Sequence, residues 1–279
     1  NDTGHKKRKT NVLGLSQKAL AQSFQKMGIS EKDVNMRVKQ VWSWIYSHGK
    51  SSFAEMTNLS KDFRLLLHEN YNLERPIIVK KQVSLDGTRK YLFKTDRIGE
   101  FETVFIPEED RGTVCLSSQI GCTLNCSFCH TGTQSLVRNL EPFEIVGQVL
   151  AIKDDLKDWD RKNKYNIKRT ISNIVMMGMG EPLLNFGPVV DAMALMLEDQ
   201  AYCLSKRRVT LSTSGVVPNL NELAKVTDVA LAVSLHAPND ALRNELVPIN
   251  RKYPIAVLFD SIRNYLDGLS DNRSVTFEY

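Results

Sequence analysis

The sequence lacks the features that mark membrane, secreted, fibrous and disordered proteins. It contains no apolar run long enough to cross a bilayer, no visible secretory signal peptide, and no internal repeat or long low-complexity segment. Hydrophobic residues occupy 42% and charged residues 25% of its 279 positions, as in an ordinary globular protein. We therefore expect a cytoplasmic protein with one large domain, or with one large and one small domain.

Neither sign of charge is in large excess. The formal net charge of +5 fits an RNA partner without requiring one. The basic run Lys6–Lys9 is predicted either as a solvated flexible end or as an RNA-contacting arm. Residue 1 is Asn rather than Met, so we expect the natural N-terminus to be missing.

Cysteine is scarce and unevenly placed. The chain has five cysteines, and four of them fall within residues 115–129. A secreted disulfide framework would be shorter and would spread its cysteines, so the cluster predicts metal or redox chemistry in a reducing cytoplasm. Cys203 stands alone and is expected to be a buried apolar residue.

The chain divides by pattern into three parts. Residues 1–75 are predicted to form a small all-helical accessory domain, with Val38, Val41, Trp42 and Ile45 on one helical face. Residues 76–107 are predicted to form a β-hairpin linker around the turn signal Asp86-Gly87. Residues 108–279 alternate short apolar strands with helices, which predicts βαβ units and a parallel sheet, open or closed into a barrel. The fold class is therefore α/β, with ligands expected at the carboxyl ends of the strands.

The strongest chemical signal is the C-x3-C-x2-C motif of Cys122, Cys126 and Cys129, just after the first core strand. Three thiolates at this spacing can bind three irons of a cubane cluster and leave the fourth iron open for a small molecule. A zinc site that recruits Cys115 or His130 is the alternative, since structural zinc usually asks for four protein ligands.

This motif resembles the signature of the radical S-adenosylmethionine (SAM) superfamily. The resemblance implies a partial (βα) radical SAM barrel and a 4Fe-4S cluster whose open iron binds the amino and carboxylate groups of SAM. It also implies that an electron from the cluster cleaves SAM to a 5′-deoxyadenosyl radical. The segment Met177–Pro182, which follows the second core strand, resembles the glycine-rich motif of the superfamily, and Glu181 could accept a hydrogen bond from the SAM ammonium group.

A closer resemblance covers nearly the whole chain. The segments that carry it, 42–46, 55–60, 115–122, 138–140, 178–185, 205–215 and 234–239, are similar to the RlmN-type RNA methyltransferases. The resemblance implies methylation of C2 of one adenine in 23S ribosomal RNA, and of an adenine in tRNA anticodon loops. In that family one SAM methylates a cysteine near the C-terminus, and a second SAM supplies the radical. The S-methylcysteine radical then adds to adenine C2, and a second cysteine resolves the protein–RNA adduct through a disulfide. A flavodoxin-like electron donor is expected.

The resemblance also assigns roles to single residues. It implies Cys115 as the resolving cysteine and Glu102 as the acceptor of the C2 proton, a role for which a partly buried site would raise the carboxyl pKa. SAM contacts are implied for the strand-end residues Gly180, Glu181, Ser212, Ser234, Leu235 and His236. Lys206, Arg207 and Arg208 are predicted to face phosphates or to form a solvated turn.

The chain departs from the family pattern in one respect, and two alternative functions fit the same residues. The methyl-carrying cysteine of the family lies beyond Tyr279, so we expect a truncated chain that cannot complete methyl transfer. A Cfr-type enzyme, which methylates C8 of the same adenine and confers antibiotic resistance, shares the same cysteines. A non-catalytic RNA-binding protein with a structural zinc site is the alternative of a different class.

Overall fold

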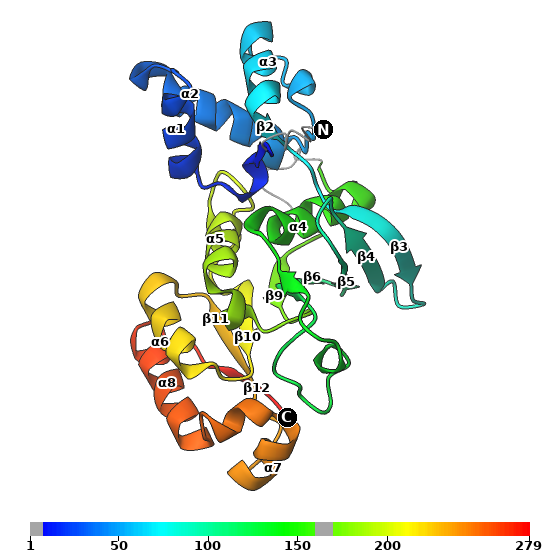
Figure 1. Ribbon diagram of the computed structural model, residues 1–279, viewed down its shortest axis with the longest axis vertical. Coiled ribbons are helices and arrows are strands. Elements are labelled where there is room, and N and C mark those ends of the chain that lie inside the picture. The colour runs from blue at the N-terminus through cyan, green and yellow to red at the C-terminus, as the bar shows by residue number, and fades with distance from the viewer. Residues whose placement is uncertain (1–7, 160–169) are drawn as a thin grey trace, which may run out of the picture.

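The computed structural model describes residues 8–159 and 170–279, which form an elongated molecule with a helical module at one end (Figure 1). The module contains α1 (Gln17–Lys26), α2 (Glu31–Trp42) and α3 (Lys61–Asn70), and one π-helical turn, Ser43–Ser47, continues α2. Ser16, Ser30 and Ser60 cap the three helices by accepting a backbone N–H in the first turn. Short strands β1 (Thr10–Asn11) and β2 (Tyr71–Asn72) pair in parallel and close the module.

The buried face of this module is aromatic. Trp42 and Tyr46 pack edge to face with ring centroids 5.0 Å apart, and Phe24 packs likewise on Phe63. These rings are buried in the core, as the helical periodicity predicts.

An antiparallel extension follows the module. Strands β3 (Ile77–Val83), β4 (Arg89–Lys94) and β5 (Glu100–Pro107) pair in sequence, with the predicted turn at Asp86-Gly87. Tyr91 and Thr103 hydrogen-bond to Asp155 and Gln148 of the helix below the sheet, so this face of the extension is buried. Side chains at the alternate positions, such as Glu102, point to the opposite face.

The core is an eight-stranded sheet of order β12-β11-β10-β9-β6-β5-β4-β3. Its parallel strands are β6 (Gly112–Cys115), β9 (Asn173–Met176), β10 (Val209–Thr213), β11 (Ala230–Ser234) and β12 (Thr276–Glu278). The helices between them are α4 (Pro142–Leu156), α5 (Phe186–Leu197), α6 (Val217–Val226), α7 (Asp240–Leu246) and α8 (Ile255–Asp267). The order is linear in the described residues, with no closed barrel, which confirms the predicted partial α/β barrel.

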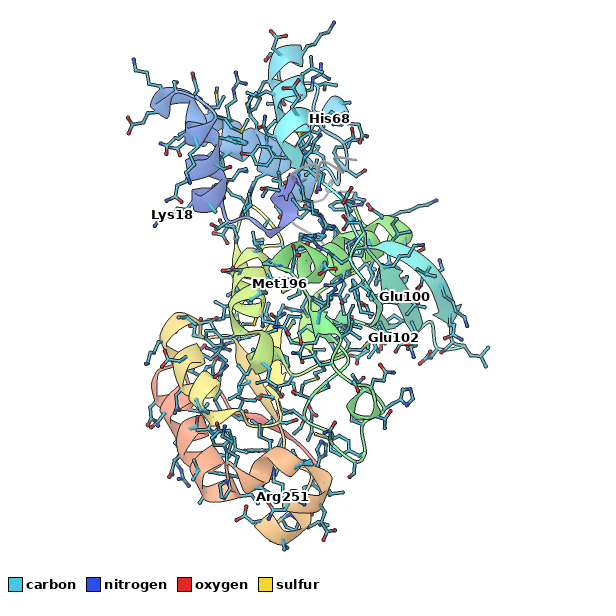
Figure 2. All side chains as sticks on the ribbon, in the orientation of Figure 1. Lys18, His68, Glu100, Glu102, Met196 and Arg251 are labelled. Carbon is cyan, nitrogen blue, oxygen red and sulfur yellow. The ribbon has the colours of Figure 1, made fainter. Side chains whose placement is uncertain are left out.

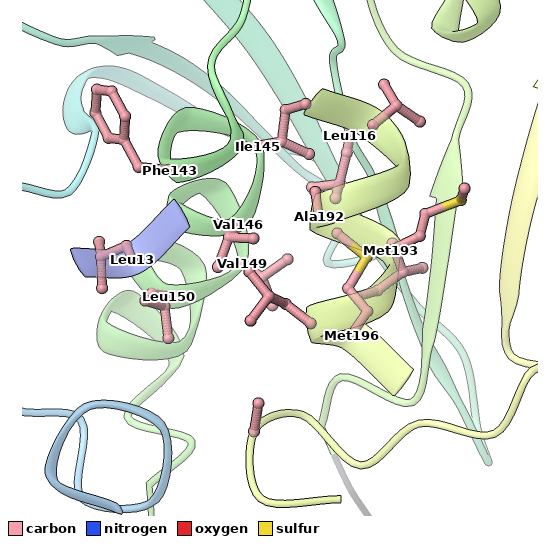
Figure 3. Close-up of a cluster of buried hydrophobic side chains, with 14 of the residues drawn as sticks. Leu13, Leu116, Phe143, Ile145, Val146, Val149, Leu150, Ala192, Met193 and Met196 are labelled. Carbon is pink, nitrogen blue, oxygen red and sulfur yellow. The ribbon is translucent and has the colours of Figure 1, made fainter. Parts of the chain in front are cut away.

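Helices α4 and α5 join the two ends of the molecule. Val146 and Val149 of α4 face Met193 and Met196 of α5, and Leu13 covers α4 from the helical module (Figure 3). Each of these side chains is almost fully buried. The accessory module therefore shares one continuous hydrophobic core with the sheet.

Two details differ from the sequence-based expectations. Helix α7 was not predicted, because seven residues are too few to show a helical period. Cys203, expected to be buried, is exposed and lies at a positive φ of 53° in the loop after α5. That loop turns back toward β10, which leaves the thiol on the surface. None of the helices in the described ranges combines the length and the apolar character needed to span a bilayer.

Candidate functional site

Loops that follow the parallel strands surround one pocket of about 170 Å³. Parallel strands end on the same edge of a sheet, so the segments after β6, β9, β10 and β11 converge there. Seven of the predicted site residues line this pocket: Cys122, Cys126, Cys129, Gly180, Glu181, Ser212 and Ser234. The pocket thus brings the thiols together with most of the predicted SAM contacts.

The cysteine loop forms one wall of the pocket. The backbone N–H of Cys129 donates to the Cys126 carbonyl, and Ser127 N–H donates to the carbonyl of Leu246 at the end of α7. Gly132 approaches this loop so closely that an added Cβ would lie 2.8 Å from the Cys126 carbonyl oxygen. Within the described ranges, no three His, Cys, Asp or Glu side chains gather as ligands of a single metal ion.

The donor set of this wall suits an iron–sulfur cluster. Burial raises the pKa of the Cys126 thiol to about 11, while a hydrogen bond with the Ser214 side chain lowers it. Burial also raises the pKa of Cys122. Thiols in such an environment are stable as thiolates only beside a positive partner, and iron bound there would supply that charge. Three thiols on one wall of a pocket leave the other walls for a small ligand.

Glu181 is a buried carboxylate at the floor of the pocket, with 3% of its surface exposed. Its Oε1 accepts hydrogen bonds from Thr213 Oγ1 at 2.8 Å and Leu183 N at 3.1 Å, and its Oε2 accepts from Ser214 N at 2.9 Å. Burial raises its pKa, and these three hydrogen bonds act against that rise. Oε2 has one protein donor and retains capacity for a donor from a ligand.

Gly180 holds the backbone before Glu181 in a conformation that needs glycine. Its φ is +93°, and an added Cβ would lie 2.4 Å from Cβ of Gln119. Gln119 is buried, and its Oε1 accepts from the Glu181 backbone N–H at 2.9 Å. The loop after β6 therefore fixes the start of the Glu181 segment.

Ser212 and Ser234 are linked by Glu278, a residue that the sequence analysis missed. The Ser212 hydroxyl donates to Glu278 Oε1 at 3.2 Å, and the Ser234 hydroxyl donates to Oε2 at 2.8 Å. The register pairs Ser234 with Glu278, and Ser212 lies on the same face. Strand alternation placed Glu278 on this face, but the sequence alone did not show which strands would be neighbours.

Leu235 and His236 do not line the pocket in the described structure. Both backbone N–H groups donate to the carbonyl of Glu278, and His236 has a positive φ of 57°. The His236 ring lies 4.1 Å from the ring of Phe128 in the cysteine loop. Burial lowers the His236 pKa, while Glu278 raises it and Arg243 lowers it further.

Cys115 and Glu102 lie outside the pocket on the same face of the sheet. Cys115 pairs with Val104, two residues from Glu102 along β5. Burial raises the pKa of Cys115 to about 11, a hydrogen bond from the backbone of Met177 lowers it, and the charge of Glu278 raises it. Glu102 lies on the antiparallel extension (Figure 2). It pairs with Lys90 at 2.8 Å, and both side chains are nearly half exposed.

The backbone of Glu102 is tied to the pocket loops. Its N–H donates to the Met179 sulfur at 3.4 Å, and its carbonyl accepts from the hydroxyl of Ser117. The same hydroxyl accepts from Met179 N–H at 2.9 Å. Glu102 is thus held next to the glycine-rich segment although its side chain does not enter the pocket.

The predicted basic segment Lys206–Arg208 lies at the opposite edge of the sheet, before β10. Lys206 pairs with Asp228 at 2.5 Å, Arg207 pairs with Asp271 at 2.9 Å, and Arg208 donates to the side chain of Asn173. Of the basic run Lys6–Lys9, Arg8 pairs with Asp96 and Lys9 donates to the carbonyl of His68, while residues 6 and 7 lie outside the described residues.

Two family models match this chain, and they cover its two ends. Residues 116–277 match the radical SAM superfamily, and residues 10–73 match the ribosomal RNA large subunit methyltransferase N-terminal domain. Two similar curated proteins are called dual-specificity RNA methyltransferase RlmN. The protein of Bradyrhizobium sp. strain ORS 278 is 51% identical over 277 residues, 97% of this chain and 68% of that protein. The Paracoccus denitrificans protein is 51% identical over 270 residues, 96% of this chain and 69% of that protein.

A solved structure has the same fold. The crystal structure of a radical SAM methyltransferase from Sphaerobacter thermophilus superposes with a TM-score of 0.86 at 38% sequence identity. The superposition covers 97% of this chain and 76% of that one.

Proposed function

The chain belongs to the RlmN-type RNA methyltransferases of the radical SAM superfamily, and from this premise we propose that it methylates C2 of one adenine in 23S ribosomal RNA. An adenine in tRNA anticodon loops is the second proposed substrate, and the cytoplasm is the proposed site of action. The family's cofactors, a 4Fe-4S cluster and SAM, are those of this enzyme. The observation that carries the proposal is the single pocket in which three thiols meet Gly180, Glu181 and the strand-end serines.

The pocket residues have distinct proposed tasks. Cys122, Cys126 and Cys129 would hold three irons and leave the fourth for SAM. When bound, the cluster supplies the electron that cleaves SAM, and SAM supplies the methyl group. Glu181 Oε2 would accept from the SAM ammonium group, because among the described residues it has a single protein donor.

The strand-end residues complete the proposed SAM site. The hydroxyls of Ser212 and Ser234 donate to Glu278, which leaves their oxygens to accept hydrogen bonds from a ligand. Gly180 allows the backbone to approach the ligand closely. Leu235 and His236 would contribute through their backbone, which the Glu278 carbonyl holds in position.

Cys115 and Glu102 are the proposed resolving cysteine and proton acceptor. In this role Cys115 would attack the sulfur of the methyl-carrying cysteine and form a disulfide, while Glu102 would take the proton from C2. With its pKa near 11, the Cys115 thiol must pass its proton to a base before it can attack. Their positions on one face, two residues apart in register, support a shared role.

The face that carries Glu102 continues outward as a proposed RNA path. Lys80, Lys90 and Lys94 project from β3 and β4 on this face and are exposed to solvent. Phosphates that approach along it would meet three cations before the base reaches Glu102. Within this proposal, residues 1–75 form the accessory domain, residues 76–107 form the linker and residues 108–279 form the catalytic core. A flavodoxin-like protein is the proposed electron donor.

Two measurements test the proposed function. Anaerobic purification of the full-length protein should give a brown protein with about four irons per chain, and a colourless protein with one zinc would reject the enzyme proposal. Mass spectrometry of ribosomal RNA from a host that expresses the full-length gene should then detect 2-methyladenosine. Detection of 8-methyladenosine without the 2-methyl isomer would favour the Cfr-type alternative. The match of residues 10–73 to the N-terminal family model supports the C2 enzyme.

A further inference from the structure

Arg243 is fully buried behind the pocket, although arginine is among the residues that are rarely buried without a charged partner. It lies in α7, the helix that follows β11, and contacts the turns at the ends of β10 and β11. Among the described residues, no carboxylate forms an ion pair with its guanidinium group. Burial lowers its pKa, so the buried charge has a cost that its contacts must offset.

Those contacts are four oxygens from three segments of the chain. Nε donates to the Leu235 carbonyl at 3.1 Å, and Nη2 donates to the carbonyls of Ser214 at 2.7 Å and Ser234 at 3.0 Å. Nη1 donates to Asn250 Oδ1 at 2.8 Å. One guanidinium therefore fixes the ends of two parallel strands relative to each other.

Helix α7 also holds the cysteine loop. The carbonyl of Leu246, its last residue, accepts from the backbone N–H of Ser127, which lies between two of the three cluster cysteines. The side chain of Ser214, whose carbonyl Arg243 binds, hydrogen-bonds to Cys126. The cysteine loop, the Ser214 turn and the Ser234–Leu235 turn are thus fastened to the same short helix.

We propose that Arg243 is a positioning residue for SAM binding, because it holds the two strand-end turns in register with the cysteine loop that α7 anchors. The proposal rests on the SAM site proposed above. Arg243 itself need not touch SAM, since its donors point to the protein side of the turns. Its removal should loosen the turns and weaken SAM binding in addition to destabilising the fold.

The test compares SAM affinity in full-length, cluster-loaded protein purified anaerobically. Arg243→Lys keeps the charge, but one ammonium group cannot reach four oxygens spread over three segments. We expect its SAM dissociation constant to rise about tenfold. The EPR change of the reduced cluster on SAM addition should require correspondingly more SAM. Arg263→Lys is the matched control, because Arg263 is exposed on α8 and, within the part of the chain that the structure describes, pairs with Asp260 alone, three residues away.

A second variant covers the case in which Arg243→Lys does not fold. Asn250→Ala leaves Arg243 in place but removes its Nη1 acceptor, together with the hydrogen bonds that the Asn250 amide donates to Asp240 and Asn244. It should raise the SAM dissociation constant about threefold. Melting temperatures separate the effects, since simple destabilisation lowers the melting temperature without changing the affinity of the folded protein. Wild-type affinity in both variants, or in Asn250→Ala alone if the lysine variant is not recovered folded, would overturn this inference. Failure of the wild-type protein to bind SAM would instead overturn the proposed function.

Discussion

Replacing Gly180 with alanine should destabilise the protein through two effects, backbone strain and a steric clash. The φ of +93° costs a residue with a Cβ about 1–2 kcal/mol. The added Cβ would also lie 2.4 Å from Gln119 Cβ, 2.7 Å from its Cγ and 2.8 Å from its Oε1. Overpacking of this kind costs about 1–3 kcal/mol. The sum of about 2–5 kcal/mol is a large fraction of a typical stability of roughly 5–15 kcal/mol.

The clash cannot be relieved by moving the tip of a flexible side chain. The nearest atom is the Cβ of Gln119, which the backbone fixes, and its Oε1 accepts from the Glu181 N–H. A shift of Gln119 would break that hydrogen bond and displace Glu181. We therefore expect the Gly180→Ala variant to lose SAM affinity as well as stability.

Two other glycines provide matched controls. Gly28 has a φ of +88° but nothing within 4 Å of an added Cβ, so Gly28→Ala should cost only the backbone part, about 1–2 kcal/mol. Gly187 lies in the first turn of α5 without a positive φ, but it precedes Pro188, whose ring disfavours a helical residue with a Cβ, so we expect no stabilisation from Gly187→Ala. Urea unfolding of the three variants under anaerobic conditions measures the series. A Gly180→Ala variant as stable as Gly28→Ala would refute the steric part of the reasoning.

Three further predictions concern charge and ionisation. Burial raises the Glu181 pKa above its ordinary value of 4.5, so the folded state binds this proton more tightly than the unfolded state. The free energy of unfolding should therefore fall as the pH rises from about 4.5 through the raised pKa. Glu181→Gln should remove this pH dependence from the free energy of unfolding, and an unchanged dependence would contradict the assignment. Cys115, with a pKa of about 11, should react with iodoacetamide at pH 8 more slowly than exposed Cys203. Mass mapping of the labelled peptides measures both rates, and faster labelling of Cys115 would contradict this prediction. Replacing Lys80 and Lys94 together with glutamine should weaken RNA binding and reduce the slope of log K against log salt concentration by roughly 1.5, whereas an unchanged slope would exclude this face as the RNA path.

The sequence predicts the framework of the sheet well because its signals are local. The strand at Val209–Thr213 and the helix at Ile255–Asp267 each carry an unbroken apolar pattern, and Asp86-Gly87 is a strong turn signal. The sequence pattern does not predict helix α7, because its seven residues span only two turns. Its N-cap Asn239, which accepts from Leu242 N, was the one local signal of its start.

The site could be predicted only in part, for a different reason. The cluster cysteines and Gly180 lie in motifs whose residues are close in sequence. Gln119, Arg243 and Glu278 act through contacts between segments 7 to 66 residues apart, so their roles depend on which strands become neighbours. Cys203 was misjudged because burial of a lone cysteine is a statistical tendency, and the loop geometry after α5 decides its exposure.

The pocket rim is held by a series of hydrogen bonds between protein groups. Gln119 accepts from the backbone of Glu181, whose carboxylate accepts from Ser214 N–H. The carbonyl of Ser214 accepts from Arg243, which also donates to the carbonyl of Ser234. The Ser234 hydroxyl in turn donates to Glu278. Two buried groups of opposite charge, Glu181 and Arg243, belong to this series of hydrogen bonds but do not form an ion pair with each other. Each is a cost to folding, and an apolar substitute could not fix the turns in the same way. These contacts fix the turns that line the pocket, and rigid turns reduce the ordering cost that SAM binding would otherwise carry.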